Sequence, residues 1–237
     1  MTDIRLHRYA DSGAVDSGVA ALLARRLTSG PTRSTFKLCV SDGLGGVFAE
    51  LPAAVAATGA KPRRLDLWWS DDGYVDVTDP ARASTKTLAA LGGLGLTPGH
   101  VHPMPTTAGN PDADAAAMRY AAELGETAFD LALLEIAADG GLAGVAPRSP
   151  TFTRPAPHKV VALHTAKGER LAMSLAMLAR AAEVWLVAAN GITAPLVKRV
   201  MDDDKALPAG VLRGRKATHL FADDKAAANL PWHVCQL

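Results

Sequence analysis

The sequence predicts an α/β fold built on a doubly wound, mostly parallel sheet with helices on both faces. Three observations lead to this prediction. Short apolar runs alternate with longer alanine-rich segments of helical period, Ala, Leu and Val supply most of the apolar residues, and only 5% of the residues are aromatic. Apolar strands that alternate with helices are typical of a parallel sheet covered on both sides. The 237 residues suit one large domain, so we expect a single domain over residues 1–237.

Each element is predicted from its apolar pattern, taken in chain order. Short apolar runs predict strands at Phe36–Val40, Leu65–Trp69, Asp130–Leu134, Lys159–Leu163, Val184–Ala188 and Thr218–Phe221. Longer periodic segments predict helices at Asp11–Thr28, Val47–Thr58, Ala81–Leu91, Ala113–Leu124, Glu169–Arg180 and Ala194–Met201, with a last short helix at Asp223–Leu230. Segments rich in Pro and Gly predict loops at Gly99–Pro111 and Pro147–Pro157.

Charge and cysteine content exclude several classes of protein. Lys and Arg number 25 and Asp and Glu 24, so the net charge of +1 gives no reason to expect nucleic acid or an anionic membrane as a partner. No apolar run approaches the length of a membrane span, and Met1–Arg8 does not resemble a signal peptide. Cys39 and Cys235 make no disulfide framework, so we expect a reducing cytoplasm.

The first candidate site follows the strand at Phe36–Val40. The segment Ser41–Gly46 holds three glycines and opens into a helix. Such a turn can cradle a phosphate, because backbone N–H groups and the helix dipole point at the anion. It can equally be a tight turn that needs a positive φ. Asp42 counts against phosphate, since its carboxylate repels an anion.

Acidic residues follow the next two strands. Asp71 and Asp72 come just after Leu65–Trp69. Paired carboxylates there can act as a general base, hold a metal or accept hydrogen bonds, or simply form a solvated turn or helix cap. Glu135 and Asp139 follow the third strand, with no nucleophile or histidine beside them. Although carboxylates can hold Mg²⁺ or Ca²⁺, we expect no metal and no cofactor.

These three segments, in this order, resemble the 6-phosphogluconolactonase family, whose sugar-phosphate isomerase-like α/β fold is shared with glucosamine-6-phosphate deaminase. Further similar segments are Val101–Met104, Leu207–Gly210 and Phe221–Ala227, so the resemblance covers nearly the whole chain. It implies a small-molecule sugar phosphate or lactone as ligand. The reaction that it implies is hydrolysis of 6-phosphogluconolactone to 6-phosphogluconate in the pentose phosphate pathway.

The sequence departs from this family at the residues that carry the chemistry. The family's Asp-Gly-His is Asp139-Gly140-Gly141 here, and the histidine that usually serves as the acid/base is replaced by Gly141. A lysine of the family is replaced by Thr193, and a glycine at the end of the third strand by Glu135. We therefore expect a degenerate active site in which catalysis is weakened or lost.

The resemblance also assigns candidate site residues. The surviving catalytic candidates are Asp71 and Asp139. The candidates for substrate binding are Ser41, Gly43, Arg82, His102, Arg154 and Lys159. Two alternatives remain open at this point. The protein could be a non-catalytic binding or assembly partner of a pentose phosphate pathway enzyme, or an enzyme for a ligand without phosphate.

Overall fold

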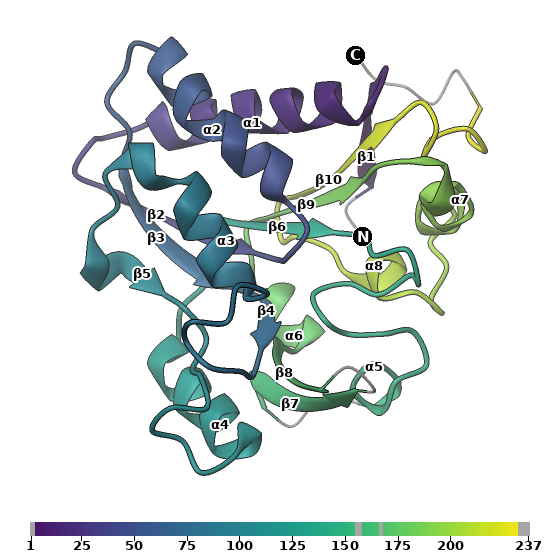
Figure 1. The fold of residues 1–237 in the computed structure, drawn as a ribbon. Helices are drawn as coiled ribbons and strands as arrows, with labels where there is room; N and C mark the ends of the chain where they lie inside the picture. The colour runs from purple at the N-terminus through teal and green to yellow at the C-terminus, as the bar shows by residue number, and fades with distance from the viewer. Residues whose placement is uncertain (1–2, 155–157, 166–167, 232–237) are drawn as a thin grey trace.

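The computed structural model describes residues 3–154, 158–165 and 168–231, and its main feature is a seven-stranded parallel sheet (Figure 1). The strand order is β1-β10-β9-β6-β2-β3-β5, and every neighbouring pair is parallel. The strands are β1 (Ile4–Tyr9), β2 (Thr35–Val40), β3 (Arg64–Trp69), β5 (Val101–His102), β6 (Leu131–Glu135), β9 (Glu183–Ala188) and β10 (Ala217–Asp223). The predicted fold class is confirmed.

Helices cover the sheet and form most of the connections between its parallel strands. The longer ones are α1 (Ser12–Thr28), α2 (Gly45–Ala57), α3 (Ala83–Ala90), α4 (Ala113–Leu124) and α7 (Ala194–Met201), each at a predicted position. Asp11 is the N-cap of α1 and Asp112 is the N-cap of α4, since each carboxylate accepts a hydrogen bond from an amide in the first turn. Figure 1 shows α1 and α2 packed together on one side of the sheet. No helix in the described ranges is long and apolar enough to cross a membrane.

A second, antiparallel sheet corrects the predicted element order. It consists of β4 (Asp71–Gly73), β8 (Gly168–Met173) and β7 (Val160–Thr165), in the order β4-β8-β7. The predicted strand at Lys159–Leu163 forms here rather than in the parallel sheet. The predicted helix at Glu169–Arg180 is wrong, since this segment forms β8 and only the short α6 (Leu175–Leu178). The hydrogen bonds of β8 to two neighbouring strands override its helical period.

Smaller differences lie at the edges of the fold. Strand β1 was not predicted, and the segment after β10 forms turns instead of the predicted helix at Asp223–Leu230. The predicted loop at Gly99–Pro111 contains the short strand β5. The predicted loop at Pro147–Pro157 contains α5 (Pro150–Thr153), and its last three residues lie outside the described ranges. The remaining short helices are α8 (Pro208–Val211) and the 3₁₀ turns Gly92–Leu94, Pro98–His100 and Gly191–Thr193.

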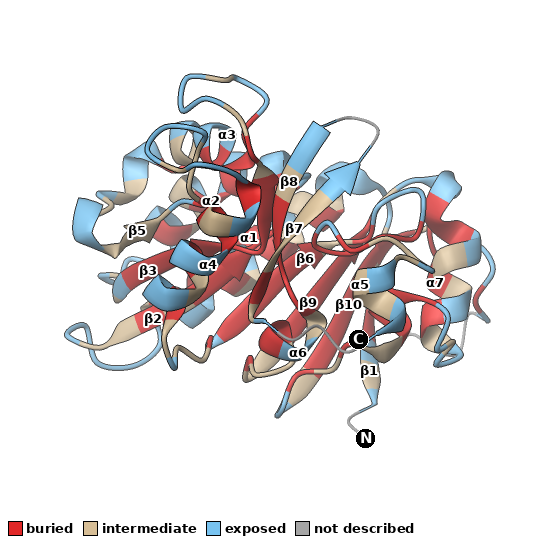
Figure 2. Ribbon diagram, turned by 90° about the horizontal axis from the view of Figure 1, so that it is seen from below, coloured by how far each residue is buried: buried red, intermediate tan, exposed pale blue. Residues whose placement is uncertain are grey.

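The central strands of the large sheet form the core and also determine where a ligand can bind. Figure 2 shows them as a buried band between the surrounding helices. From β2 the chain proceeds outward to β3 and β5, whereas from β6 it proceeds in the opposite direction to β9 and β10. The two starting strands, β2 and β6, are neighbours. Ligands of such sheets bind outside the carboxyl ends of the strands at this switch point.

Candidate active-site pocket

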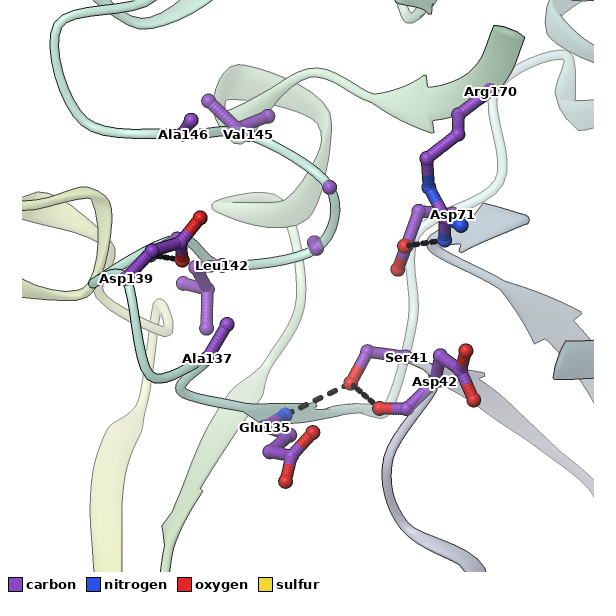
Figure 3. A pocket seen from close by; sticks show the side chains of 13 residues that line it. Ser41, Asp42, Asp71, Glu135, Ala137, Asp139, Leu142, Val145, Ala146 and Arg170 are labelled. Atoms are coloured by element: carbon purple, nitrogen blue, oxygen red, sulfur yellow. Dashed lines mark hydrogen bonds and ion pairs between the residues drawn. The ribbon is translucent and has the colours of Figure 1, made fainter. Parts of the chain in front are cut away.

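A pocket of about 190 Å³ lies at the carboxyl ends of β2 and β6, at the switch point (Figure 3). Its walls come from the turn after β2, from β4, from the segment after β6 and from β8. The lining residues are Ser41, Asp42, Asp71, Glu135, Ala137, Asp139, Gly141, Leu142, Ala143, Gly144, Val145, Ala146 and Arg170. Residues from the two sheets therefore meet in one cavity.

Ser41 joins the ends of β2 and β6 at the pocket wall. Its hydroxyl donates to the carbonyl oxygen of Asp42 at 2.9 Å and accepts a hydrogen bond from the amide of Glu135 at 2.8 Å. The amide of Ser41 also donates to the carbonyl of Leu133. Ser41 thus lies in the predicted site, and its hydroxyl holds the end of β2 against the end of β6.

The segment after β6 places Asp139 on the pocket wall. The amide of Gly141 donates to Asp139 Oδ1 at 2.8 Å, and the amide of Ala137 donates to the carbonyl of Gly141. Between them Gly140 has a φ of +83°, which favours glycine. The turn that carries the Asp-Gly-Gly sequence therefore retains an ordered geometry although it lacks the histidine.

Glu135 extends from the end of β6 against the glycine-rich turn. A Cβ atom added at Gly43, where φ is +88°, would overlap the carboxylate of Glu135. Gly43 does not line the pocket itself, but its missing side chain provides the space for Glu135. The pKa of Glu135 is raised to about 6, first by burial and then by the negative charges of Asp42, Asp71 and Asp16.

Asp71 and Arg170 form an ion pair at the pocket wall. Arg170 Nη2 lies 2.7 Å from Asp71 Oδ2, and the hydroxyl of Ser70 donates to Asp71 Oδ1. Asp71 is only 4% exposed. Burial raises the pKa of Asp71 more than the guanidinium of Arg170 lowers it. Arg170 was not among the predicted site residues, because its segment was predicted to be a helix. It lies in β8, next to the buried residues Leu171 and Ala172.

Two predicted binding residues have other partners. Arg82 is 2% exposed and pairs with Asp72 at 3.3 Å, while it donates to the carbonyl of Met104 at 2.7 Å. His102 stacks on Trp68 with ring centroids 3.8 Å apart and bonds to Asp66. Neither side chain lines the pocket.

The two remaining predicted cations also lie elsewhere. Lys159 bonds to the carbonyl of Gly125 and pairs with Glu126 at 2.8 Å. Arg154 lines a separate cavity beside α5 and α6. The structure therefore brings together Ser41, Asp71 and Asp139 in the pocket, and Gly43 lies next to the lining residue Glu135.

Negative charge dominates the pocket. Four carboxylates line it, from Asp42, Asp71, Glu135 and Asp139, whereas Arg170 is the one basic side chain among the described lining residues. Lys86 pairs with Asp42 at 3.1 Å, but it is half exposed and lies outside the lining. Within the described ranges, no group of His, Cys, Asp and Glu side chains is arranged to hold a metal ion.

The parallel sheet and its pocket define an α/β protein with a ligand site at a topological switch point. Residues 10–221 match the family described as glucosamine-6-phosphate isomerases/6-phosphogluconolactonase, and the chain belongs to this family. The resemblance found in the sequence is thereby confirmed.

Individual relatives support this assignment over more than nine tenths of the chain. A 6-phosphogluconolactonase of Streptomyces coelicolor is 29% identical over 91% of this chain and 90% of its own length. One of Mycobacterium leprae is 25% identical over 94% and 97%. Two solved structures share the fold. They are 6-phosphogluconolactonase from Trypanosoma brucei (TM-score 0.79, 20% identity, 98% of this chain and 100% of that one) and a monomeric glucosamine-6-phosphate deaminase (TM-score 0.80, 15% identity, 95% and 99%).

Proposed function

We propose that this protein hydrolyses a sugar lactone, with 6-phosphogluconolactone as the family substrate, and that it does so more slowly than relatives that carry the motif histidine. The observation that carries this proposal is the pocket in which Asp71, Asp139 and Arg170 converge at the switch point. The full-length relatives named as 6-phosphogluconolactonases support the same reaction.

Lactone opening adds water to a carbonyl carbon and generates negative charge on the carbonyl oxygen. Arg170 is suited to stabilise this charge, because its guanidinium lies at the pocket wall and is held there by Asp71. Asp139 is held at the opposite part of the wall by the amide of Gly141. The pocket thus has a cation for the developing oxyanion and carboxylates that can orient water and substrate hydroxyl groups.

Two features of the same pocket support the slow rate in this proposal. Gly141 has no side chain to transfer a proton, and loss of a general acid/base reduces a rate by about 10²–10⁴-fold. A phosphate group on the substrate would also approach the carboxylates of Asp42 and Glu135 at the glycine-rich turn. We therefore expect both a low kcat and a high KM for 6-phosphogluconolactone.

The test is an assay of lactone opening at neutral pH, corrected for spontaneous hydrolysis. Purified protein should open 6-phosphogluconolactone above the blank, and Gly141→His should raise the rate. A Cβ atom at Gly141 would lie 2.9 Å from Asp139 Oδ1, so this variant requires only a small turn of that carboxylate. A wild-type rate equal to the blank at micromolar protein would disprove the proposed function.

A further inference from the structure

The pocket contains one further carboxylate, that of Glu135, for which the family resemblance gives no role. Glu135 ends β6, lines the cavity together with Asp139 and Gly141, and places its carboxylate against Gly43. It makes no salt bridge to any described residue. Its backbone is held by Ser41, so the carboxylate starts from a fixed point on the central strand.

We propose that Glu135 is the general base of lactone opening in this protein, in place of the side chain that Gly141 lacks. This inference rests on the proposed function and adds the residue that activates water. It is carried by the geometry of the cavity. Asp71 is engaged by Arg170, Asp42 by Lys86 and Asp139 by the amide of Gly141, whereas no described residue forms an ion pair or a hydrogen bond with the carboxylate of Glu135.

The surroundings of Glu135 suit a base that works at neutral pH. Asp42 faces it from the glycine-rich turn, Asp71 from β4 and Asp16 from α1, and all three raise its pKa together with burial. Asp139 and Arg170 face the same cavity from the segment after β6 and from β8. With a pKa of about 6, Glu135 is mostly ionised at pH 7 and binds a proton more strongly than an ordinary glutamate does.

Water and the lactone are the only reactants of the proposed step, and Glu135 carries the proton between them. The carboxylate of Glu135 takes a proton from water while the water oxygen bonds to the lactone carbonyl carbon, and the π electrons of the carbonyl move to its oxygen. When the tetrahedral intermediate collapses, the bond between the carbonyl carbon and the ring oxygen breaks. Glu135 returns its proton to the ring oxygen, which becomes a hydroxyl group, and the new carboxylic acid ionises into solvent.

The experiment measures kcat/KM for 6-phosphogluconolactone between pH 4.5 and 8 in wild type and variants. Wild type should gain activity through an apparent pKa near 6. Glu135→Gln should lose about 10²–10⁴-fold and the pH dependence with it. The matched control is Glu126→Gln, because Glu126 is 84% exposed and lies outside the pocket, and it should leave the profile unchanged.

Two further variants distinguish a base from a structural residue. Asp42→Asn should move the apparent pKa to a lower pH, because it removes a negative charge that acts on Glu135. Glu135→Ala should regain activity when formate is added, since formate can supply the missing carboxylate, and Glu135→Gln should not.

The outcomes separate the two proposals. A folded Glu135→Gln protein with the rate and pH profile of wild type overturns the role of Glu135 and leaves the proposed function intact. Failure of formate to raise the rate of a folded Glu135→Ala protein counts against the role in the same way. A wild-type rate equal to the blank overturns both proposals together.

Discussion

Asp71 and Asp72 are neighbours on β4, yet they serve two different regions of the molecule. Asp72 is 1% exposed and accepts hydrogen bonds from the amides of Ala83 and Ser84 at 2.9 and 3.2 Å and from the hydroxyl of Ser84, and it pairs with Arg82. All of these partners belong to the start of α3. Asp71 points instead into the pocket and pairs with Arg170 from the second sheet.

The difference follows from the geometry of a strand, in which successive side chains point to opposite faces. One aspartate is surrounded by protein donors and connects β4 to α3. The other pairs with Arg170 at the pocket wall, and burial raises its pKa. The two neighbouring aspartates thus differ in role because one connects two elements of the fold and the other lines the pocket.

The largest effect on stability is expected when Asp72, whose carboxylate has several protein partners, is replaced. Asp72→Ala leaves Arg82 buried without its carboxylate and removes the acceptor for the first amides of α3. Breaking a buried ion pair costs about 3–5 kcal/mol of the free energy of unfolding. Urea unfolding should show a loss of this size, and a loss below about 1 kcal/mol would contradict the structural role assigned to Asp72.

Replacement of Asp71, which faces the pocket, should reduce activity rather than stability. Burial raises the pKa of Asp71, so its ionised form is not favoured by folding, and Asp71→Asn keeps an acceptor for Arg170 while it removes a repulsion with Glu135. The free energy of unfolding should therefore change by much less than in Asp72→Ala. Lactone opening should fall by about tenfold to a hundredfold, since a hydrogen bond to a charged group contributes about 1.5–3 kcal/mol. A stability loss as large as that of Asp72→Ala, with activity unchanged, would reverse the comparison.

A smaller effect should distinguish the pocket from the rest of the fold by its pH dependence. The pKa of Glu135 in the folded protein is about 6, above the ordinary value of 4.5. The folded protein therefore binds this proton more tightly than the unfolded chain does, and the free energy of unfolding falls as the pH rises from 4.5 to 6. Glu135→Gln should therefore be more stable than wild type at pH 7.5, by about 1 kcal/mol after allowance for solvent screening. The difference should disappear below pH 4.5, as thermal or urea unfolding at both pH values can test.

Most of the parallel sheet could be predicted from the sequence, because its strands are short apolar runs separated by periodic helices. The segment Gly168–Met173 could not, since Leu171, Leu175 and Leu178 fit a helical period. Strand β1 escaped prediction because Arg5, His7 and Arg8 interrupt its apolar pattern, which an edge strand tolerates. These errors were local, and the fold class did not depend on them.

The candidate site was predictable only in part. Ser41, Asp71 and Asp139 follow strands of the central sheet or start the strand beside it, and residues at strand ends converge in this fold class. The predicted cations Arg82, Arg154 and Lys159 do not enter the pocket, because each has partners or surroundings elsewhere that the sequence does not reveal. Arg170 enters it through a strand pairing between β4 and β8, residues that are about a hundred positions apart.

The sequence by itself determined the family, the fold class and the absence of a histidine at Gly141, since these depend on residue identity and on local periodicity. Only the tertiary structure decided which charges share the pocket. Asp71 and Asp72 point to opposite faces of β4, so only Asp71 lines the pocket. Pairing of β4 with β8 places Arg170 at the same wall, and the missing side chain of Gly43 leaves space for Glu135. Charges act over distances of a few ångströms, and such distances between remote parts of the chain exist only after folding.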